Sequence, residues 1–490
     1  MARLTFVFMK LCMFLLIGMT YVFGKSFGTR PLGAINRSFK PIKINAESSL
    51  NSLGYKVYNY TQTLDHFNFK PDSHMTFQNR YIVISKYWGG SSKNAPIFVY
   101  TGEEVDIIAD VELGFPPLLA ARFKALLVYI EHRYYGTSMP FGSRDKAYKN
   151  SSTLGYFTSE QALADYAQII VDLKKNMSAQ SCPVITIGAS YGGMLASWFR
   201  MKYPHIAYGA YAVSAPILYF LGLTPQTGYD GIVSKDFNST STNCYNTIRE
   251  SWFEIDRVAT QPDGLFNLSK MFNTCLPLNS TQELKDSLEG GYGYWAQYDN
   301  PTDNYLQHFC NVIDGAGKKT CILNKIIAGV VALKGNRCIQ VGNDSRYKYP
   351  GWDWQSCTEM VMPFGRGEND TMYQANPFDL NKYIKECQQV FGVTPRPYWI
   401  PVEFGGYGIK TVLKKFASNI IFTNGLRDPY SSGGVLQNIS DTVVALYTEK
   451  GHHCLDITSP LKTDPDWLTE QRMSVINTIQ GWLSKYNVPS

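Results

Sequence analysis

The amino-acid sequence predicts an α/β fold in which one parallel sheet is interrupted by a mainly helical insertion. Short apolar runs, bounded by proline, glycine or charged residues, alternate with helical patterns up to about residue 215 and again after residue 405. Runs of this kind are typical of buried parallel strands. Between the two regions, cysteines and polar loops dominate. Strands that are split around a helical block indicate one sheet domain that carries a cap.

The chain begins with a pattern typical of a secretory signal peptide at residues 1–24. Arg3 and Lys10 precede an apolar run at 11–23 that is too short to span a membrane comfortably. An uncleaved anchor is the alternative. No later segment offers about 18 uninterrupted apolar residues. We therefore expect a protein of the secretory pathway, extracellular or vacuolar/lysosomal, with no membrane association after signal cleavage.

Sequons and cysteines agree with this route. Asn-x-Ser/Thr sequons, which predict a glycosylated surface, begin at Asn36, Asn59, Asn150, Asn176, Asn238, Asn267, Asn279, Asn343, Asn369 and Asn438. Once Cys12 leaves with the signal peptide, nine cysteines remain, and seven lie between Cys244 and Cys387. In an oxidising compartment this cluster predicts local disulfides. Because nine is odd, at least one thiol is unpaired.

The first part of the sheet domain is expected at residues 25–219. Its short apolar runs predict strands at 97–100, 126–130, 184–187 and 211–217. Between the second and third strands, residues 159–173 have helical spacing, and Ser159 is positioned to cap that helix.

The stretch Gly188-Ala-Ser-Tyr-Gly-Gly193 joins the third of these strands to a helical pattern at 194–203. A strand, a sharp turn and a helix around G-x-S-x-G are typical of the nucleophile elbow of an α/β-hydrolase. Small residues flank Ser190 because the strained turn leaves no room for larger ones. Short Gly/Ser strings also mark ordinary turns, so the prediction depends on partners for Ser190.

A helical, disulfide-stapled cap is expected at residues 220–405, followed by the second part of the sheet domain at 406–490. The helices and strands expected there are helices at 244–258 and 323–333, strands at 419–423 and 443–447, and a closing helix at 466–486. The first of these strands runs into Asp428, and the second runs into His452 and His453.

These residues complete a predicted Ser-Asp-His triad, since an α/β-hydrolase carries its acid and then its histidine after late strands. Ser190 would attack a carbonyl carbon while the histidine takes its proton and returns it to the leaving group. Asp428 would orient the ring and stabilise the imidazolium. From the residues alone, His452 and His453 both remain open as the base.

The oxyanion hole is expected to combine two backbone N–H groups. One belongs to Tyr191, directly after the nucleophile, and the other to Gly102 or Glu103 in the loop after strand 97–100.

Composition excludes several other functions. A net charge of +6 over 490 residues is mild, and without a dense Lys/Arg block nucleic-acid binding has no support. The sequence has no C-x-x-C pair and no H-E-x-x-H string, so we expect neither a metal nor a cofactor. Homodimer formation is left open.

Seven further stretches, in order along nearly the whole mature chain, make the sequence similar to a known family. They are Leu64-Asp-His-Phe67, Tyr100-Thr-Gly-Glu-Glu104, Glu131-His-Arg-Tyr-Tyr-Gly136, Met139-Pro-Phe-Gly142, Thr158-Ser-Glu-Gln-Ala-Leu-Ala-Asp165, Cys357-Thr-Glu-Met-Val-Met-Pro363 and Asn424-Gly-Leu-Arg-Asp-Pro-Tyr430. With them the chain resembles the prolyl-cleaving serine exopeptidases of the lysosomal Pro-X carboxypeptidase and dipeptidyl peptidase II family. The resemblance implies an α/β-hydrolase domain with a helical cap, and cleavage on the carboxyl side of proline near a peptide terminus.

The resemblance also implies roles for single residues. The family's Gly-Ala-His-His-x-Asp run aligns with residues 451–456, which favours His453 over His452. We expect Met362, Tyr430 and Glu104 to contact the substrate. The disulfides that the resemblance implies are Cys244–Cys310, Cys275–Cys338 and Cys357–Cys387. Cys182, Cys321 and Cys454 then remain, and a bond between Cys182 and Cys454 is one option.

The chain departs from the family pattern near the predicted site. The oxyanion loop reads Gly102-Glu-Glu-Val-Asp106 where the family has Gly-Asn-Glu-Gly-Asp, and Val105 cannot adopt glycine-only backbone angles cheaply. Tyr430 stands where tryptophan is usual, beside the S1 subsite. Arg427 is unusual next to Asp428, and its charge should keep that acid ionised.

The preferred hypothesis is therefore a serine exopeptidase that acts on short proline-containing peptides. Carboxypeptidase and dipeptidyl peptidase modes stay open, because they differ in whether the cleft offers a cation to a carboxylate or an anion to an ammonium group. Glu103 and Glu104 favour the anion, although acidic loop residues are more often solvated or structural. An esterase or lipase on the same scaffold and an inactive peptide-binding glycoprotein are the competing functions.

Overall fold

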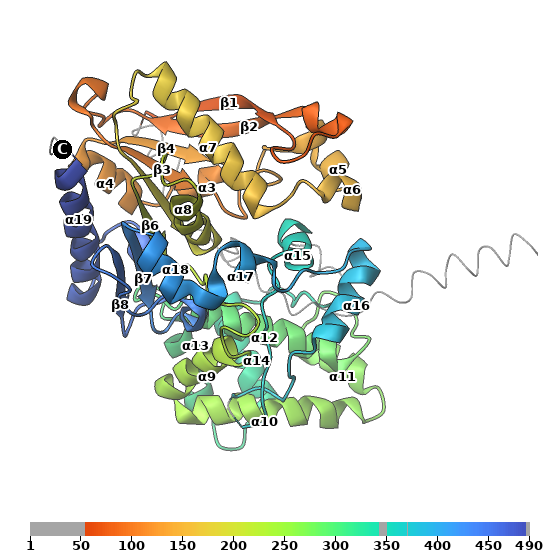
Figure 1. Cartoon of the computed structure of the whole chain (residues 1–490). Helices are drawn as coiled ribbons and strands as arrows, with labels where there is room; N and C mark the ends of the chain where they lie inside the picture. Colours follow the sequence, from red (N-terminus) through yellow and green to blue (C-terminus); the bar gives the residue numbers. More distant parts are fainter. Residues whose placement is uncertain (1–53, 343–349, 370, 487–490) are drawn as a thin grey trace, which may run out of the picture.

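The computed structural model describes residues 54–342, 350–369 and 371–486. An eight-stranded sheet runs from the top of Figure 1 down its left side, and most of the helices from the middle of the chain lie below it and to its right. The expected signal peptide and the sequons at Asn36 and Asn343 lie outside the described residues. Among the residues that are described, no helix has both the length and the apolar character needed to cross a bilayer.

The sheet has the strand order β1-β2-β4-β3-β5-β6-β7-β8. The strands are β1 (Lys56–Thr63), β2 (Thr76–Ile84), β3 (Ile97–Thr101), β4 (Leu126–Ile130), β5 (Val184–Ala189), β6 (Gly209–Val213), β7 (Ile420–Gly425) and β8 (Val443–Thr448). Strand β2 runs antiparallel to its neighbours β1 and β4, and all other pairs are parallel. This mixed sheet, with its crossovers between β3, β4 and β5, is the sheet of an α/β-hydrolase.

Both faces of the sheet are covered by helices, because successive side chains of each central strand point to opposite sides. Ile97 and Val99 of β3 pack on the side of α7 (Ser159–Asn176) and α8 (Ser190–Lys202). Phe98 and Tyr100 pack on the other side, in the same apolar cluster as the helices of that face. Those helices are α3 (Ile107–Val111), α4 (Phe115–Phe123) and α19 (Asp466–Tyr486). Burial of both faces explains the continuous apolar runs in the sequence.

Two features of the sheet differ from the sequence-based expectations. The sequence-based expectations did not include β1 and β2. Most of β1 is exposed and lacks an apolar run, whereas β2 ends in the short apolar run at 81–84. The strand expected at 211–217 is wrong at its end, since β6 stops at Val213. Ser214 has φ 45°, in the left-handed region, and turns the chain out of the sheet.

The sheet is interrupted between the end of β6 and the start of β7, and helices fill most of this interval. They are α9 (Gly228–Thr240), α10 (Thr242–Ala259), α11 (Gly264–Met271), α12 (Thr281–Gln297), α13 (Tyr305–Gly315), α14 (Ile322–Lys334), α15 (Pro350–Ser356), α16 (Leu380–Phe391), α17 (Trp399–Glu403) and α18 (Ile409–Phe416). In Figure 1, α15 and α17 lie between the sheet and the helices α9 to α14. We propose that residues 220–405 form the cap.

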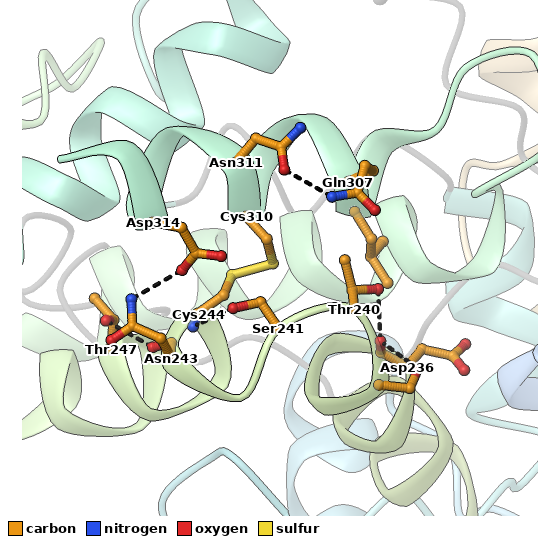
Figure 2. Close-up of a disulfide and its surroundings, with 12 residues drawn as sticks. Asp236, Thr240, Ser241, Asn243, Cys244, Thr247, Gln307, Cys310, Asn311 and Asp314 are labelled. Atoms are coloured by element: carbon orange, nitrogen blue, oxygen red, sulfur yellow. Dashed lines mark hydrogen bonds between the residues drawn. A yellow bond between two sulfur atoms is a disulfide. The ribbon is translucent and has the colours of Figure 1, made fainter.

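Three disulfides hold the cap, and they are the pairs that the family resemblance implied: Cys244–Cys310, Cys275–Cys338 and Cys357–Cys387. Figure 2 shows the first of them, which joins the start of α10 to α13. Beside it, the side-chain amide of Asn243 donates to the Asp314 carboxylate over 2.8 Å. These links fix one long cap helix against another.

The suggested bond between Cys182 and Cys454 is wrong, since both thiols are free in the structure, as is that of Cys321. Cys182 lies two residues before the start of β5, whereas Cys454 follows β8. Strands β5, β6, β7 and β8 are parallel, so the start of β5 and the end of β8 lie at opposite ends of the strands. The two cysteines are therefore on opposite sides of the sheet along the strand direction.

Eight of the ten sequons fall on described residues, and all eight asparagines are exposed. Exposure is required for glycan attachment, so each of these positions can carry a glycan.

A buried ion pair ties the N-terminal hairpin to α7. The Arg133 guanidinium donates two hydrogen bonds of 2.6 Å to the Asp165 carboxylate, and both side chains are inaccessible to solvent. The same guanidinium donates to the carbonyl of Leu64 over 2.7 Å, just after β1. His66 also contacts Asp165, over 2.8 Å.

Replacing Asp165 should therefore destabilise the fold. In Asp165→Asn, Arg133 keeps a buried charge without its counter-ion, which costs about 3–5 kcal/mol of unfolding free energy. The exposed pair Lys202–Glu403 provides the control, since Glu403→Gln should cost less than about 1 kcal/mol. Denaturant unfolding of both variants measures the difference, and equal small losses would contradict the role assigned to Asp165.

Candidate active site

Ser190 lies at the turn between β5 and α8, and its backbone is strained. Its φ is 55°, a value that residues other than glycine rarely adopt. The neighbouring glycines are required by close packing rather than by their own angles. A Cβ on Gly192 would lie 2.6 Å from the Thr101 carbonyl oxygen, and one on Gly193 would lie 2.7 Å from that of Val213. The turn thus presents the Ser190 hydroxyl at the carboxyl ends of the central strands.

His453 connects Ser190 to Asp428. Its Nδ1 lies 2.7 Å from Asp428 Oδ2, and its Nε2 lies 2.9 Å from Ser190 Oγ. A carboxylate only accepts, so Nδ1 carries the ring proton and Nε2 is left to accept from the serine hydroxyl. The second oxygen of Asp428 accepts from the backbone N–H of Tyr430 over 2.9 Å, at the start of the short helix η6 (Pro429–Gly433). All three side chains are buried.

His452, the other candidate base, points away from Ser190. Its Nδ1 lies 3.1 Å from the carbonyl oxygen of Ala296, near the end of the cap helix α12. Burial, assisted by the charge of Arg427, lowers the pKa of His452 to about 3, so the ring stays neutral. The structure thus brings His453, and not His452, to Ser190.

The cap holds the loop that carries His453. The backbone N–H of His453 donates to the carbonyl of Gln297 over 3.1 Å, next to the bond that His452 makes. Carbonyls at a helix C-terminus lack partners within the helix. The last carbonyls of α12 are therefore available to accept hydrogen bonds from this loop. The ring of Tyr298, at the end of α12, lies 5.8 Å from the His453 ring.

The sequence places Arg427 next to Asp428, but its hydrogen bonds go to the cap. Its guanidinium bonds instead to two cap carboxylates, Asp236 over 3.2 Å and Asp299 over 3.3 Å. Asp236 lies on α9, near the disulfide drawn in Figure 2. Burial raises the pKa of Asp236 to about 7, even though Arg427 opposes this shift. The Arg427 side chain therefore links the loop after β7 to the cap.

The expected oxyanion loop needs one correction. The N–H of Gly102 donates to the carbonyl of Ile130 over 2.9 Å, which extends the pairing of β3 with β4. This donor is already engaged, so Gly102 is excluded as an oxyanion donor and Glu103 remains. The Tyr191 N–H belongs to the first turn of α8, where backbone donors have no partner within the helix.

The side chain of Glu103 is buried beside the elbow and is not a simple anion. Burial, followed by the charges of Glu104 and Asp110, raises its pKa well above the usual range, while the backbone N–H of Gly192 opposes the shift. A carboxyl group that holds its proton offers no negative charge to a substrate ammonium group. Of the two acidic residues that favoured an anion in the cleft, this argument concerns Glu103 alone.

Two aromatic rings, those of Tyr298 and Tyr430, lie beside His453. The ring of Tyr430 lies 5.5 Å from that of His453 and is packed by three further rings. These belong to Tyr219, Tyr229 and Phe364 and lie 5.9, 4.9 and 6.1 Å from it. Nothing in the sequence pattern marks these three residues, because they come from separate segments. Met362 is buried in the same apolar cluster as Tyr430, and Glu104 is also buried.

Within the described ranges, no group of three or more His, Cys, Asp and Glu side chains is arranged to hold a metal ion.

Comparison with known proteins decides the family. The profile of the family described as serine carboxypeptidase S28 matches residues 62–475. The chain belongs to this family. Membership of the S28 family makes it a serine-type peptidase, a hydrolase whose substrates are peptides.

Relatives of this S28 peptidase match almost its whole length. It is 37% identical to the lysosomal Pro-X carboxypeptidase of Homo sapiens over 93% of both chains. It is 32% identical to prolyl carboxy peptidase like protein 5 of Caenorhabditis elegans, over 90% of this chain and 92% of that one. It is 28% identical to the thymus-specific serine protease of Homo sapiens, over 92% and 93% of the two chains.

The raised pKa of Asp236 predicts a pH-dependent stability. Between the usual pKa of 3.8 and about 7, the folded protein keeps a proton that the unfolded chain releases. The resulting stabilisation is complete below pH 3.8 and is lost as the pH rises through about 7. Asn cannot ionise, so Asp236→Asn should gain stability relative to the wild type between pH 4 and pH 8.

The melting temperatures of the two proteins, measured over this pH range, provide the test. His452 contributes in the opposite sense, since its lowered pKa costs stability as the pH falls. Its contribution cancels in the difference between wild type and variant. A difference that does not change with pH would contradict the role of Asp236.

Proposed function

We propose that this peptidase hydrolyses peptide bonds on the carboxyl side of proline near a peptide terminus, through a Ser190–His453–Asp428 triad. The observation that carries the proposal is the continuous hydrogen-bond chain from Asp428 Oδ2 through the His453 ring to Ser190 Oγ, with links of 2.7 and 2.9 Å. An acid, a base and a nucleophile in these contacts are the arrangement that serine peptidases of unrelated folds use.

In the proposed reaction, Ser190 Oγ attacks the carbonyl carbon of the proline residue while His453 Nε2 takes the hydroxyl proton. The N–H groups of Tyr191 and Glu103 hold the oxygen that becomes negative. His453 then protonates the departing amine, which leaves an ester between the substrate and Ser190. Water attacks this ester in a second cycle of the same proton transfers, and Asp428 stabilises the imidazolium in both cycles.

The surroundings of His453 support a preference for proline. Proline presents a compact apolar ring and has no N–H to satisfy, so an apolar and aromatic wall suits it. We propose that Tyr430 and Met362 contact this ring. We also propose that Glu104, which lies in the same loop as Glu103, contacts the substrate. Tyr298 of the cap also lies against the His453 ring, and we propose that this contact favours short peptides over folded proteins.

We propose the carboxypeptidase mode and a lysosomal or vacuolar compartment. The first of two observations supports both, and the second supports the acidic compartment. Relatives that are 37% identical are named lysosomal Pro-X carboxypeptidases. In addition, burial raises the pKa of Asp236 to about 7 and that of Glu359 to about 8. Carboxyl groups of this kind favour the folded state at acidic pH.

Product analysis tests the mode of cleavage. We expect peptides with a penultimate proline to lose one C-terminal residue, and peptides with proline in the second position to keep their N-terminal dipeptide. Ser190→Ala should lower kcat by about 10⁴-fold or more, and His453→Ala should do the same. His452→Ala is the matched control and should retain most of the activity, because its ring bonds only to the cap.

Mass spectrometry of the products distinguishes the alternatives. Release of an N-terminal dipeptide would replace the carboxypeptidase mode with the dipeptidyl peptidase mode. Turnover of p-nitrophenyl acyl esters without any peptide cleavage would contradict the peptidase and indicate an esterase.

A further inference from the structure

The residue after the nucleophile makes side-chain contacts that the proposed mechanism does not use. The Tyr191 side chain is fully buried, and its hydroxyl has two partners. One is the side-chain amide of Gln355, whose Nε2 lies 2.8 Å away, and the other is His132, whose Nε2 lies 3.0 Å away. The same residue is expected to supply a backbone N–H to the oxyanion.

The directions of these hydrogen bonds follow from the acceptor at one end. His132 Nδ1 lies 2.6 Å from the carbonyl oxygen of Arg133, which can only accept, so Nδ1 carries the proton. Burial lowers the pKa of His132 to about 4, so its ring is neutral and Nε2 is an acceptor. The Tyr191 hydroxyl must therefore donate to His132. It is left to accept from Gln355.

The orientation of the Gln355 amide is fixed by the same argument. Its NH₂ group faces Tyr191, which needs a donor, and its Oε1 accepts from the Tyr135 hydroxyl over 2.7 Å. A flipped amide would place two acceptors against each other at Tyr191. The chain from Tyr135 through Gln355 and Tyr191 to His132 thus has a donor and an acceptor at each link. All four side chains are buried.

Gln355 comes from the cap, 164 residues away from Tyr191 in the sequence. It lies on α15, and the segment that carries it is anchored to the sheet domain on both sides. The Trp352 ring packs edge-on against Tyr191, with 5.4 Å between ring centres. The Glu359 carboxyl accepts from the backbone N–H and the hydroxyl of Ser159, over 2.9 and 3.2 Å, at the start of α7.

We propose that Gln355 is a positioning residue, which holds Tyr191 so that its backbone N–H faces the oxyanion. The elbow needs such support because Ser190 occupies a left-handed backbone conformation that costs about 1–3 kcal/mol and persists only where its surroundings enforce it. A side chain fixed at its far end by two hydrogen bonds restrains the backbone of the next residue. This inference rests on the proposed function, since it assigns Tyr191 to the oxyanion hole.

With Gln355 in this role, the cap takes part in catalysis as well as limiting access to the site. Met362, proposed to contact proline, lies seven residues after Gln355 in the same segment. One cap segment thus carries both a proposed contact for the substrate ring and the restraint on the oxyanion donor.

Steady-state kinetics with a peptide that ends in Pro-X test the role of Gln355. Gln355→Met keeps the length of the side chain but cannot donate, and Tyr191→Phe removes the hydroxyl while keeping the backbone N–H. A misplaced oxyanion donor reduces the stabilisation of the transition state but leaves the binding of the substrate in its ground state unchanged. We therefore expect each variant to lower kcat by about 10- to 100-fold with KM changed less than about twofold.

The double variant sharpens the test. If Gln355 acts through Tyr191, the double variant Gln355→Met/Tyr191→Phe should have a kcat no lower than that of the more impaired single variant. If the two residues act independently, the fold-losses in kcat of the single variants should multiply. Tyr383→Phe is the matched control. It removes a buried hydroxyl bond of 2.9 Å to the carbonyl of Ser356, next to Gln355 in the same segment, without touching Tyr191. We expect it to keep kcat.

Each outcome bears on the inference. A kcat within about twofold of wild type in Tyr191→Phe, or losses that multiply in the double variant, would overturn it while leaving the proposed peptidase intact. Equal losses in Tyr383→Phe would also overturn it, because they would indicate a general effect of loosening α15. Tyr191→Phe alone carries the test if Gln355→Met does not fold. A wild-type protein that fails to cleave the peptide would overturn both the proposed function and the inference.

Discussion

The proposed activity depends on one contact between two distant parts of the chain, the hydrogen bond between Ser190 and His453. These residues are 263 positions apart in the sequence, and the whole cap lies between them. They meet because β5, β7 and β8 run parallel, so that the turns at their carboxyl ends gather at one edge of the sheet. Asp428, after β7, completes the chain of hydrogen bonds at 2.7 Å from His453.

The cap is bound to both halves of this arrangement. On the histidine side, the last carbonyls of α12 accept from the 452–453 loop, and Arg427 pairs with Asp236 and Asp299. On the serine side, Gln355 reaches the Tyr191 hydroxyl. The cap therefore does more than cover the site, because its own hydrogen bonds hold the segments that carry His453 and Tyr191.

The sequence was most informative where local chemistry determines the structure. The elbow around Ser190, the central strands and the closing helix at 466–486 follow from patterns a few residues long. The expectations that failed concern tertiary partners. No local pattern indicated that Arg427 would pair with the cap carboxylates Asp236 and Asp299. Gly102 was offered as a free donor, yet it extends the β3–β4 pairing. The contact of Gln355 with Tyr191 joins segments whose proximity no local pattern encodes.

Covalent labelling tests the central claim most directly, because only an activated serine reacts rapidly with a fluorophosphonate. The wild-type protein should gain one phosphonyl group, and mass spectrometry of its fragments should locate that group on Ser190. Labelling should fall sharply in His453→Ala and persist in His452→Ala. An unlabelled wild-type protein, or a label on another residue, would contradict the account of Ser190 as a nucleophile activated by His453.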